Sequence, residues 1–354
     1  MKLFSKHRSL FLAGSVLALV AGCTDADVET PGDGTPIVVN PIPPSGGGAS
    51  GFAGRSTAPT SAADCPNGTM FLSNVALPSG ATTNFCSLTP LGGGNIVGTV
   101  NVPFSADPIL LSGTVFVGDA GGASGDLTIA AGQQFISQSM TGQVDLLVVS
   151  RGSTMNAVGT PTQPIIFTSA QDFEDDGMPN GTSGTGDWGG LAINGSAPLN
   201  ECTIDPAATP GSDACRQNGE GGSGEFGGAD AADSSGDFQY IRVQHAGFPF
   251  TPTNELNGVA LQGVGNGTNF EFVQVHLGAD DGFEWFGGTV NVNNLVVTGA
   301  NDDSLTGPTA GPGRFNLRWL YSSLATTTVS KATTMATRQT TPCRGRCRAF
   351  PTSH

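Results

Sequence analysis

The sequence predicts an all-β fold, a single-stranded parallel β-helix in which one chain winds into a solenoid of short strands. The first observation is that residues 272–305 contain one unit twice. In each unit a β-branched run is followed by paired aspartates, Asp280 with Asp281 and Asp302 with Asp303, and the two pairs are 22 residues apart. A repeat of that length is typical of a solenoid coil. The second observation is that most other apolar runs are short, are separated by glycine and lack helical periodicity.

The predicted solenoid covers residues 108–305. Its expected strands are the apolar runs at 114–117, 127–129, 146–149, 165–167, 188–193, 238–243, 259–261, 272–275 and 295–297. Asp126 and Asp145 precede two of these runs 19 residues apart, and Leu127 and Leu146 open them, which is the register that one coil requires. Strands this short, with few two-residue turns between them, favour parallel pairing between coils about 4.8 Å apart over a hairpin sandwich.

Three further segments flank or interrupt the predicted coils. Residues 61–107 contain short apolar runs, and we expect them to form an N-terminal cap, because a solenoid needs a cover over its apolar cross-section. Residues 171–186 and 200–236 are rich in glycine and aspartate. This composition predicts two long loops that are inserted between strands.

The body of the chain is strongly acidic. All 29 acidic residues lie between positions 23 and 305, where four arginines are the only basic residues, so this part has a formal charge of −25. Such a charge excludes nucleic acid as a partner and argues against adhesion of the body to anionic lipid. It suits solubility, a salty medium or the binding of divalent cations.

The N-terminus predicts export and a lipid anchor. Residues 1–22 combine a basic start with an apolar run and end in small residues before Cys23, which indicates a lipoprotein signal peptide and lipidation of Cys23. The apolar run is too short to span a bilayer. Residues 23–60 are rich in proline and glycine, and we expect them to form a disordered tether. The predicted location is therefore a membrane surface outside the cytoplasm, with the outer membrane favoured.

Four cysteines of the body form two local pairs that an exported protein can oxidise. Disulfides between Cys65 and Cys86 and between Cys202 and Cys215 would each close a short loop and stabilise the fold by about 3 kcal/mol. The alternative is free thiols or a metal site. The spacing disfavours a zinc site, because neither pair has the C-x-x-C spacing of zinc knuckles.

Five stretches of the body carry a resemblance to a known group. They are GDLTIAAG at 125–132, LLVVSRG at 146–152, GTPTQPIIFTS at 159–169, WGGLAING at 188–195 and DDGFEWFGGTV at 280–290. With them the chain resembles exported right-handed parallel β-helix lipoproteins of Gram-negative bacteria over about residues 110–305. The resemblance implies a right-handed β-helix at the cell surface or in the periplasm. It implies no agreed activity, so no catalytic residue is carried over.

The C-terminal residues 306–354 differ from the body. They contain seven basic residues, no acidic residue and a threonine-rich stretch at 325–336. One interpretation is a basic arm that binds nucleic acid or an acidic polymer. The hypothesis we favour is a shift of reading frame near Leu305, because the shifted codons of 325–336 admit GDNNGFEGDNNG, which resembles the DDGFE unit one coil later. On that hypothesis the tail is out of frame and disordered, and its two cysteines form no metal site.

The aspartate pairs are the candidate site. Equivalent turn positions stack in a parallel β-helix, so the two pairs would place four carboxylates on one corner, and a Ca²⁺ ion would relieve their repulsion. The predicted Ca²⁺ ligands are Asp280, Asp281, Asp302 and Asp303, with Asn301, Glu284 or backbone carbonyls completing the shell. The alternative is that each aspartate makes turn hydrogen bonds in solvent. The acidic segments 172–176 and 219–237 also contain enough carboxylates for Ca²⁺.

The function favoured by these features is binding or scaffolding at the cell surface, without catalysis. The expected partners are a polysaccharide or an outer-membrane protein, with Ca²⁺ as a structural ion. The alternative is a polysaccharide lyase or glycoside hydrolase that uses the aspartates as general acid and base, with His276, His245 or Arg242 nearby. Trp285 is a candidate for stacking on a sugar ring, although aromatic side chains at alternating strand positions also pack inward.

Overall fold

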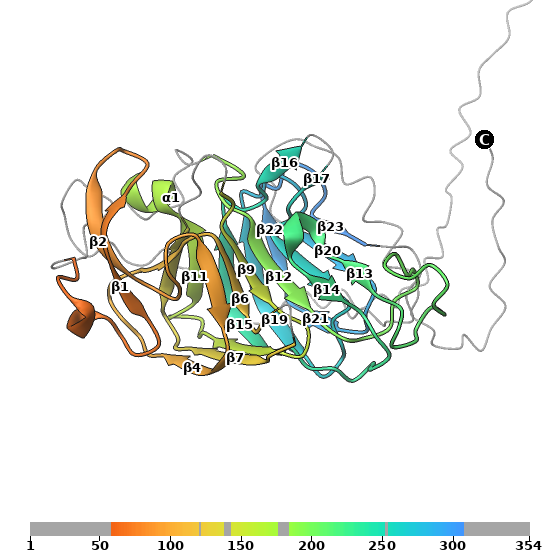
Figure 1. The fold of residues 1–354 in the computed structure, drawn as a ribbon. Helices are drawn as coiled ribbons and strands as arrows, with labels where there is room; N and C mark the ends of the chain where they lie inside the picture. Colours follow the sequence, from red (N-terminus) through yellow and green to blue (C-terminus); the bar gives the residue numbers. More distant parts are fainter. Residues whose placement is uncertain (1–57, 120–121, 138–142, 176–183, 252–253, 308–354) are drawn as a thin grey trace, which may run out of the picture. The chain divides into compact units, whose positions relative to one another are not determined.

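Parallel strands in three columns organise the chain in the computed structural model (Figure 1). The structure describes residues 58–119, 122–137, 143–175, 184–251 and 254–307. The chain divides into two units, Met1–Val38 and Val39–His354, and all described residues belong to the second.

Column 1 is a seven-stranded sheet in which every neighbouring pair is parallel. Its strands are β3 (Gly93–Ile96), β6 (Thr114–Val117), β9 (Leu146–Val149), β12 (Gly190–Asn194), β18 (Val259–Gln262), β20 (Phe283–Phe286) and β23 (Leu305–Thr306). Their order in the sheet is their order in the chain. Each strand therefore pairs with its equivalent in the preceding and following turn of the chain.

Columns 2 and 3 are two further sets of parallel strands. Column 2 contains β4 (Gly98–Val102), β7 (Gly125–Ile129), β10 (Thr154–Val158), the first half of β15 (Gly236–Gln244), the first half of β19 (Asn269–His276) and β21 (Asn291–Asn293). Column 3 contains β5 (Ile109–Leu111), β8 (Gln134–Ser137), β11 (Ile165–Ser169), the second halves of β15 and β19, and β22 (Val296–Thr298). The long strands β15 and β19 join both columns into one sheet.

The bend within β15 and β19 comes from residues in the left-handed region of the backbone. Tyr240 has a φ of 49° and Phe272 a φ of 56°, and Asn294, between β21 and β22, has a φ of 55°. The register pairs Gln239 with Glu271, so Tyr240 lies beside Phe272. Their rings stack with centroids 4.6 Å apart. This stacking helps to offset the cost of the left-handed conformation, which is about 1 kcal/mol or more for a residue with a Cβ.

The 22-residue repeat predicted from the aspartate pairs is confirmed. Gln274 pairs with Val296, and Phe283 pairs with Leu305, each 22 residues further along the chain. The 19-residue register is wrong, because the strand of Leu127 belongs to column 2 and the strand of Leu146 to column 1. Leu127 instead pairs with Met155. Short apolar runs that follow an aspartate are alike in sequence on different columns, so their similarity did not identify equivalent positions.

The parallel strands begin earlier than residue 108, the expected start. β3 and β4 already pair in parallel with β6 and β7. Both early strands contain glycine and asparagine, which are disfavoured in strands, and they have only one apolar residue in β3 and two in β4, too few to mark a strand in the sequence. Backbone pairing with the next turn forms them in spite of this low intrinsic preference.

The core lies between the columns, where inward side chains of successive strands stack. The largest cluster includes Val115, Leu147, Leu191, Val259 and Phe283 of column 1, all at most 2% exposed. Strand β7 alternates buried and half-buried residues, whereas β9, β12 and β18 are buried at every position. Other segments must therefore cover the outer side of those strands.

The N-terminal segment forms a hairpin at the edge of column 3. Its strands β1 (Met70–Ala76) and β2 (Thr82–Ser87) are antiparallel, and β2 continues the sheet by pairing in parallel with β5. A single turn of 3-10 helix, η1 (Ala62–Asp64), precedes β1, and a disulfide joins Cys65 to Cys86. The hairpin thus occupies an edge that would otherwise present unpaired backbone groups.

Insertion 171–186 contains a helix that the sequence did not predict, α1 (Ala170–Asp175). It is only six residues long, too short to show helical periodicity. The Ser169 hydroxyl accepts a 3.0 Å hydrogen bond from the Asp172 backbone N–H at its start. Ala170 and Phe173 pack with Ile136 on the outer side of column 3.

Insertion 200–236 contains the short strands β13 (Gln217–Asn218) and β14 (Glu225–Phe226) and the 3-10 turn η2 (Glu220–Gly222). A disulfide joins Cys202 to Cys215, and Phe226 packs with Leu199. A small hairpin of β16 (Pro249–Thr251) and β17 (Asn254–Glu255) follows β15. Leu256, after this hairpin, packs on Val148 and Ala260 on the outer side of column 1.

Several predicted segments lie outside the described residues. They are the signal peptide at 1–22, the lipidation site Cys23, most of the tether at 23–60, and the tail from 308 to 354. Among the helices in the described ranges, none has the length and apolar character needed to cross a membrane.

Candidate metal centre

The candidate centre is built on two successive turns between column 3 and column 1. The backbone N–H of Gly282 donates a 2.9 Å hydrogen bond to the carbonyl of Asp303, and Phe283 donates a 3.2 Å bond to Ser304. These bonds continue the register in which Phe283 pairs with Leu305. The turn that carries Asp280 and Asp281 is therefore stacked on the turn that carries Asp302 and Asp303, as the repeat predicted.

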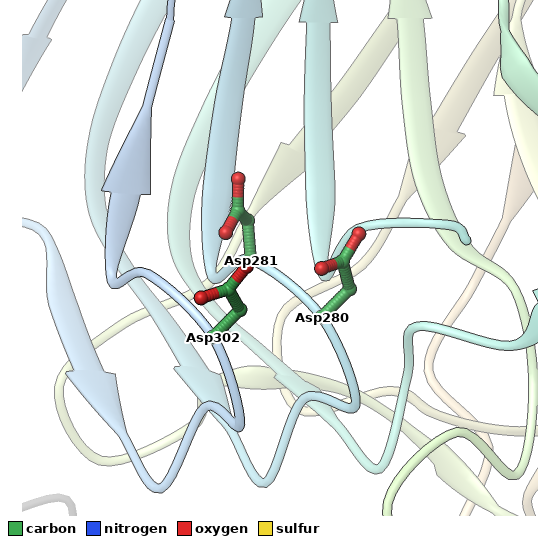
Figure 2. A group of neighbouring side chains, drawn as sticks. All are labelled: Asp280, Asp281 and Asp302. Carbon is green, nitrogen blue, oxygen red and sulfur yellow. The ribbon is translucent and has the colours of Figure 1, made fainter. Parts of the chain in front are cut away.

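Three of the four predicted carboxylates gather. Oxygen atoms of Asp280, Asp281 and Asp302 all lie within 4.8 Å of one another, and Figure 2 shows the three side chains on neighbouring turns. Asp281 is buried, Asp280 half-buried and Asp302 exposed. Asp303 is not part of this group, and its backbone N–H donates a 3.0 Å bond to Asp281 Oδ1. This bond fixes the position of the buried carboxylate between the two turns.

Burial and like charge raise the pKa values in this group. Burial, together with the negative charges of Asp281, Glu255 and Asp302, raises the pKa of Asp280 to about 7. Burial also raises the pKa of Asp281, although the nearby Thr306 hydroxyl and the hydrogen bond from the Asp303 backbone N–H act against the rise. The charges that act most strongly on these two carboxyl groups, among the residues that the structure describes, are all negative. The group therefore favours either protons or a bound cation.

The ligand chemistry fits Ca²⁺. Ca²⁺ binds oxygen ligands at about 2.3–2.6 Å, so oxygens on opposite sides of one ion are about 5 Å apart. The 4.8 Å limit on the three carboxylates is within this span. Asn301, an expected additional ligand, instead donates its amide to the Thr185 hydroxyl at 2.9 Å. Glu284, the other, contacts Asn257 and belongs to a different group of residues.

A family model described as a pectate-lyase-like beta helix domain matches residues 101–311, more than half of the 354 residues. The three columns of parallel strands fall largely within that range. The chain belongs to this β-helix family. No curated protein and no solved structure matches the chain.

A second polar group of this β-helix lies on the outer side of column 3, next to α1. The Asp172 carboxylate accepts a 2.6 Å hydrogen bond from the Thr168 hydroxyl and a 3.3 Å bond from Gln244 Nε2, and it lies 3.4 Å from His245 Nε2. Burial alone lowers the pKa of His245, but the nearby carboxylate of Asp172 outweighs it, so that the pKa is raised. Asp172, expected among the Ca²⁺-binding loop residues, is instead 1% exposed and paired with a histidine.

Arg242 and His276 face the same group from neighbouring positions of column 3. Burial lowers the pKa of Arg242, and Asp172 raises it in part. Burial, followed by the positive charges of Arg242 and His245, lowers the pKa of His276 to about 4. The three basic side chains thus interact electrostatically with Asp172, and His245 also with Asp187. These interactions do not support the expected position of Arg242, His245 and His276 as catalytic side chains beside the aspartate turns.

Trp285 cannot serve as a sugar-stacking platform in this β-helix. Its side chain is 2% exposed and belongs to the core, with its ring centroid 6.2 Å from that of Phe283. The β20 strand alternates buried and half-buried residues, so Phe283 and Trp285 point inward, and Glu284 and Phe286 point outward. The expectation of a ligand contact at Trp285 was therefore wrong.

Proposed function

We propose that this β-helix binds polysaccharide at a cell surface through Ca²⁺ held by Asp280, Asp281 and Asp302. The observation that carries the proposal is the meeting of three carboxylates within 4.8 Å, for which the described part of the chain shows no ion pair with a basic side chain. A bound Ca²⁺ ion would cancel most of the negative charge of this corner, and it would offer coordination positions that the three aspartates leave open. It would then attract the carboxylates of a uronic-acid polymer, which the protein alone would repel. Membership of a pectate-lyase-like family supports a polysaccharide as the partner.

The test is binding of a soluble polygalacturonate to the full chain, measured by calorimetry with Ca²⁺ and with EDTA. We expect binding only with Ca²⁺, and we expect the D280N/D302N variant to lose it. The matched control is D205N/D230N, because Asp205 and Asp230 are turn aspartates whose Oδ1 atoms accept backbone bonds at 3.0 and 2.9 Å. Equal binding by D280N/D302N and the wild type would contradict the proposal.

Catalysis at the same corner is the second candidate function, as a polysaccharide lyase or glycoside hydrolase. The specific observation is the pKa of about 7 at Asp280, which suits a general acid or base near neutral pH. Glycoside hydrolysis uses two carboxyl groups that flank the scissile bond, and the two adjacent turns supply carboxyl groups of that kind. Release of reducing ends or of unsaturated uronates from a glycan panel would establish it. Polysaccharide binding without release of product would favour the binding function over catalysis.

We also propose that the protein is exported and anchored by a lipid on Cys23, with an outer-membrane protein as a further possible partner. The basic start, apolar run and small residues of 1–22 support this location. We propose in addition that the columns form a single-stranded, right-handed solenoid. Parallel connections between strands of one sheet are right-handed in about 98% of cases, and successive strands of one chain visit the three columns in turn.

A further inference from the structure

Segment 184–187, which leads from insertion 171–186 into β12, contacts both turns of the candidate metal centre. The Thr185 hydroxyl accepts a 2.9 Å hydrogen bond from the side-chain amide of Asn301. A Cβ added at Gly186 would lie 3.0 Å from the Cβ of Ala279, so the segment packs closely on that turn. Asn301 and Ala279 each directly precede an aspartate of the three-carboxylate group. The segment is therefore placed to fix the position of both aspartate turns.

The carbonyl of Ala246 joins the segment to the nearer aspartate turn. It accepts a 3.1 Å hydrogen bond from the N–H of Gly186 and a 2.9 Å bond from the N–H of Ala279. The adjacent carbonyl of His245 accepts a 2.8 Å bond from the N–H of Asp187. The turn that begins at His245 thus supports the segment and the aspartate turn together.

The side chain of His245 connects the start of the segment to α1. Its Nδ1 lies 2.8 Å from the Gly184 carbonyl oxygen, and its Nε2 lies 3.4 Å from Asp172 Oδ1. A carbonyl oxygen and an ionised carboxylate can only accept hydrogen bonds, so each contact is favourable only when the facing ring nitrogen carries a proton. The geometry therefore requires the imidazolium form of His245, whose side chain is fully buried.

A neutral His245 can keep only one of these two contacts. With its proton on Nδ1, the ring bonds to Gly184 but turns the lone pair of Nε2 toward the carboxylate of Asp172. With its proton on Nε2, the ring turns the lone pair of Nδ1 toward the Gly184 carbonyl. Loss of the proton therefore weakens the connection between α1 and segment 184–187.

The charged and titratable side chains around His245, among the described residues, come from four elements. They are Asp172 on α1, Asp187 on the segment, Arg242 on β15 and His276 on β19. Burial lowers the pKa of His245, but the two aspartates raise it by more. Burial, followed by the positive charges of Arg242 and His245, lowers the pKa of His276 to about 4, so His276 is neutral near neutral pH.

We propose that His245 is a positioning residue for the Ca²⁺ site, which holds segment 184–187 against the aspartate turns when its ring is protonated and releases the segment when the proton is lost. The inference rests on the proposed Ca²⁺ site and adds a regulation of that site by pH. His245 acts through Thr185, Gly186 and Ala246 and makes no contact with the ion. Ca²⁺ affinity should therefore be higher with the imidazolium than with the neutral ring.

Amide hydrogen exchange of the full chain in EDTA tests the positioning separately from the metal. The protection factors of Gly186 and Ala279, whose N–H groups both bond to Ala246, are measured from pH 6 to pH 9. In the wild type they should fall about fivefold as the pH rises through the titration of His245, which is the effect of one lost hydrogen bond. In H245Q they should already be low at pH 6 and should not change with pH.

The matched control is H276Q, which makes the same substitution in the neighbouring histidine. His276 is neutral over this pH range, and its Nδ1 lies 2.7 Å from the Thr298 hydroxyl, not beside segment 184–187. The pH dependence of protection in H276Q should follow that of the wild type.

The T185V variant tests the other end of the connection and keeps the test decisive if H245Q fails to fold. Valine keeps the shape of Thr185 but cannot accept the hydrogen bond from Asn301. Protection of the Asn301 N–H, which bonds to the Gly278 carbonyl, should fall about two- to fivefold at every pH.

Calorimetric titration with CaCl₂ at pH 6 and pH 9 tests the regulation. Affinity rises with pH in every variant, because burial and like charge raise the pKa of Asp280 to about 7 and this carboxyl group must ionise to bind Ca²⁺. The ratio of the Kd of H245Q to the Kd of the wild type cancels this shared effect. The ratio should be about five at pH 6 and close to one at pH 9.

The outcomes separate this proposal from the proposed function. A pH-dependent loss of protection in the wild type that H245Q lacks would support positioning by His245, even if Ca²⁺ does not bind and the proposed function fails. Equal protection in the wild type, H245Q and T185V at every pH would overturn the proposal, even if Ca²⁺ binds at the aspartates. A ratio of Kd values that is the same at both pH values would overturn the regulation.

Discussion

Replacing Glu284 by glutamine should stabilise the protein at high pH in the absence of metal. Burial, together with the negative charges of Glu220 and Asp281, raises the folded-state pKa of Glu284 to about 8, above its ordinary value of 4.5. A carboxyl group with a raised folded pKa costs nothing at a pH below both values. Its destabilising effect grows as the pH rises from about 4.5 and is complete above about 8. Glutamine cannot ionise and still accepts the hydrogen bond from Asn257.

The magnitude follows from the two pKa values. At about 1.4 kcal/mol per pKa unit, ionising Glu284 in the fold costs about 5 kcal/mol relative to the unfolded chain. The side chain is only half-buried, so solvent screening reduces this cost. We expect the free energy of unfolding of E284Q to exceed that of the wild type by roughly 2–3 kcal/mol at pH 9, and to equal it at pH 4.

The assay is urea unfolding of both proteins in EDTA at several pH values from 4 to 9, followed by far-ultraviolet circular dichroism. E201Q is the control, because Glu201 is an exposed glutamate of insertion 200–236, and it should follow the wild type at every pH. Parallel stability curves for the wild type and E284Q in EDTA would refute the reasoning.

Three further predictions concern other parts of the fold. C202S/C215S should lower the free energy of unfolding by about 3 kcal/mol, since the disulfide closes a loop with a sequence separation of 13. Amide hydrogen exchange should rise throughout insertion 200–236. Unchanged exchange in this variant would contradict the view that the disulfide stabilises the insertion. W285A should lower the free energy of unfolding in urea by about 3–5 kcal/mol, because the indole lies in the core. The polysaccharide affinity of the folded variant should be unchanged. A loss of affinity without a loss of stability would contradict the buried position of Trp285. H245Q should have a lower free energy of unfolding than the wild type below pH 6.5, and the difference should shrink as the pH rises through the raised pKa of His245. A difference that grows with pH would contradict the pairing of His245 with Asp172.

The stacked aspartate turns could be predicted from the sequence because a 22-residue repeat with no insertion preserves the register. Phe283 and Leu305 show that register directly. Earlier in the chain the distance between equivalent residues varies, since loops of different length are inserted. Val259 lies 68 residues after its partner Leu191 and 24 before its partner Phe283. Variable spacing of this kind hid the three columns and led to the false match of Leu127 with Leu146.

The bends and the buried polar groups could not be predicted from local patterns. Tyr240 and Phe272 adopt a left-handed conformation that is unusual for aromatic residues, and the sequence gives no glycine to mark it. Asp172 was expected to be a loop carboxylate, and only the docking of α1 on column 3 brings it to His245. Contacts of this kind depend on tertiary structure, which short windows of sequence do not contain.

The contact between Glu220 and Asn257 was missed for the same reason, although one signal was available. Asn257 occupies the position of Asp281 one coil earlier, because Val259 pairs with Phe283. The stretch from Asn257 therefore aligns with the stretch from Asp281, and each has glycine next and an apolar residue after it. Glu220 had no such signal, because it reaches Asn257 through insertion 200–236.

A crystal structure of the protein grown with Ca²⁺, or with Tb³⁺ for its anomalous signal, tests the central claim most directly. The account predicts a peak of anomalous density bonded to carboxylate oxygens of Asp280, Asp281 and Asp302 at about 2.4 Å. A crystal grown at a saturating concentration of the ion that shows no density between these three side chains would contradict it.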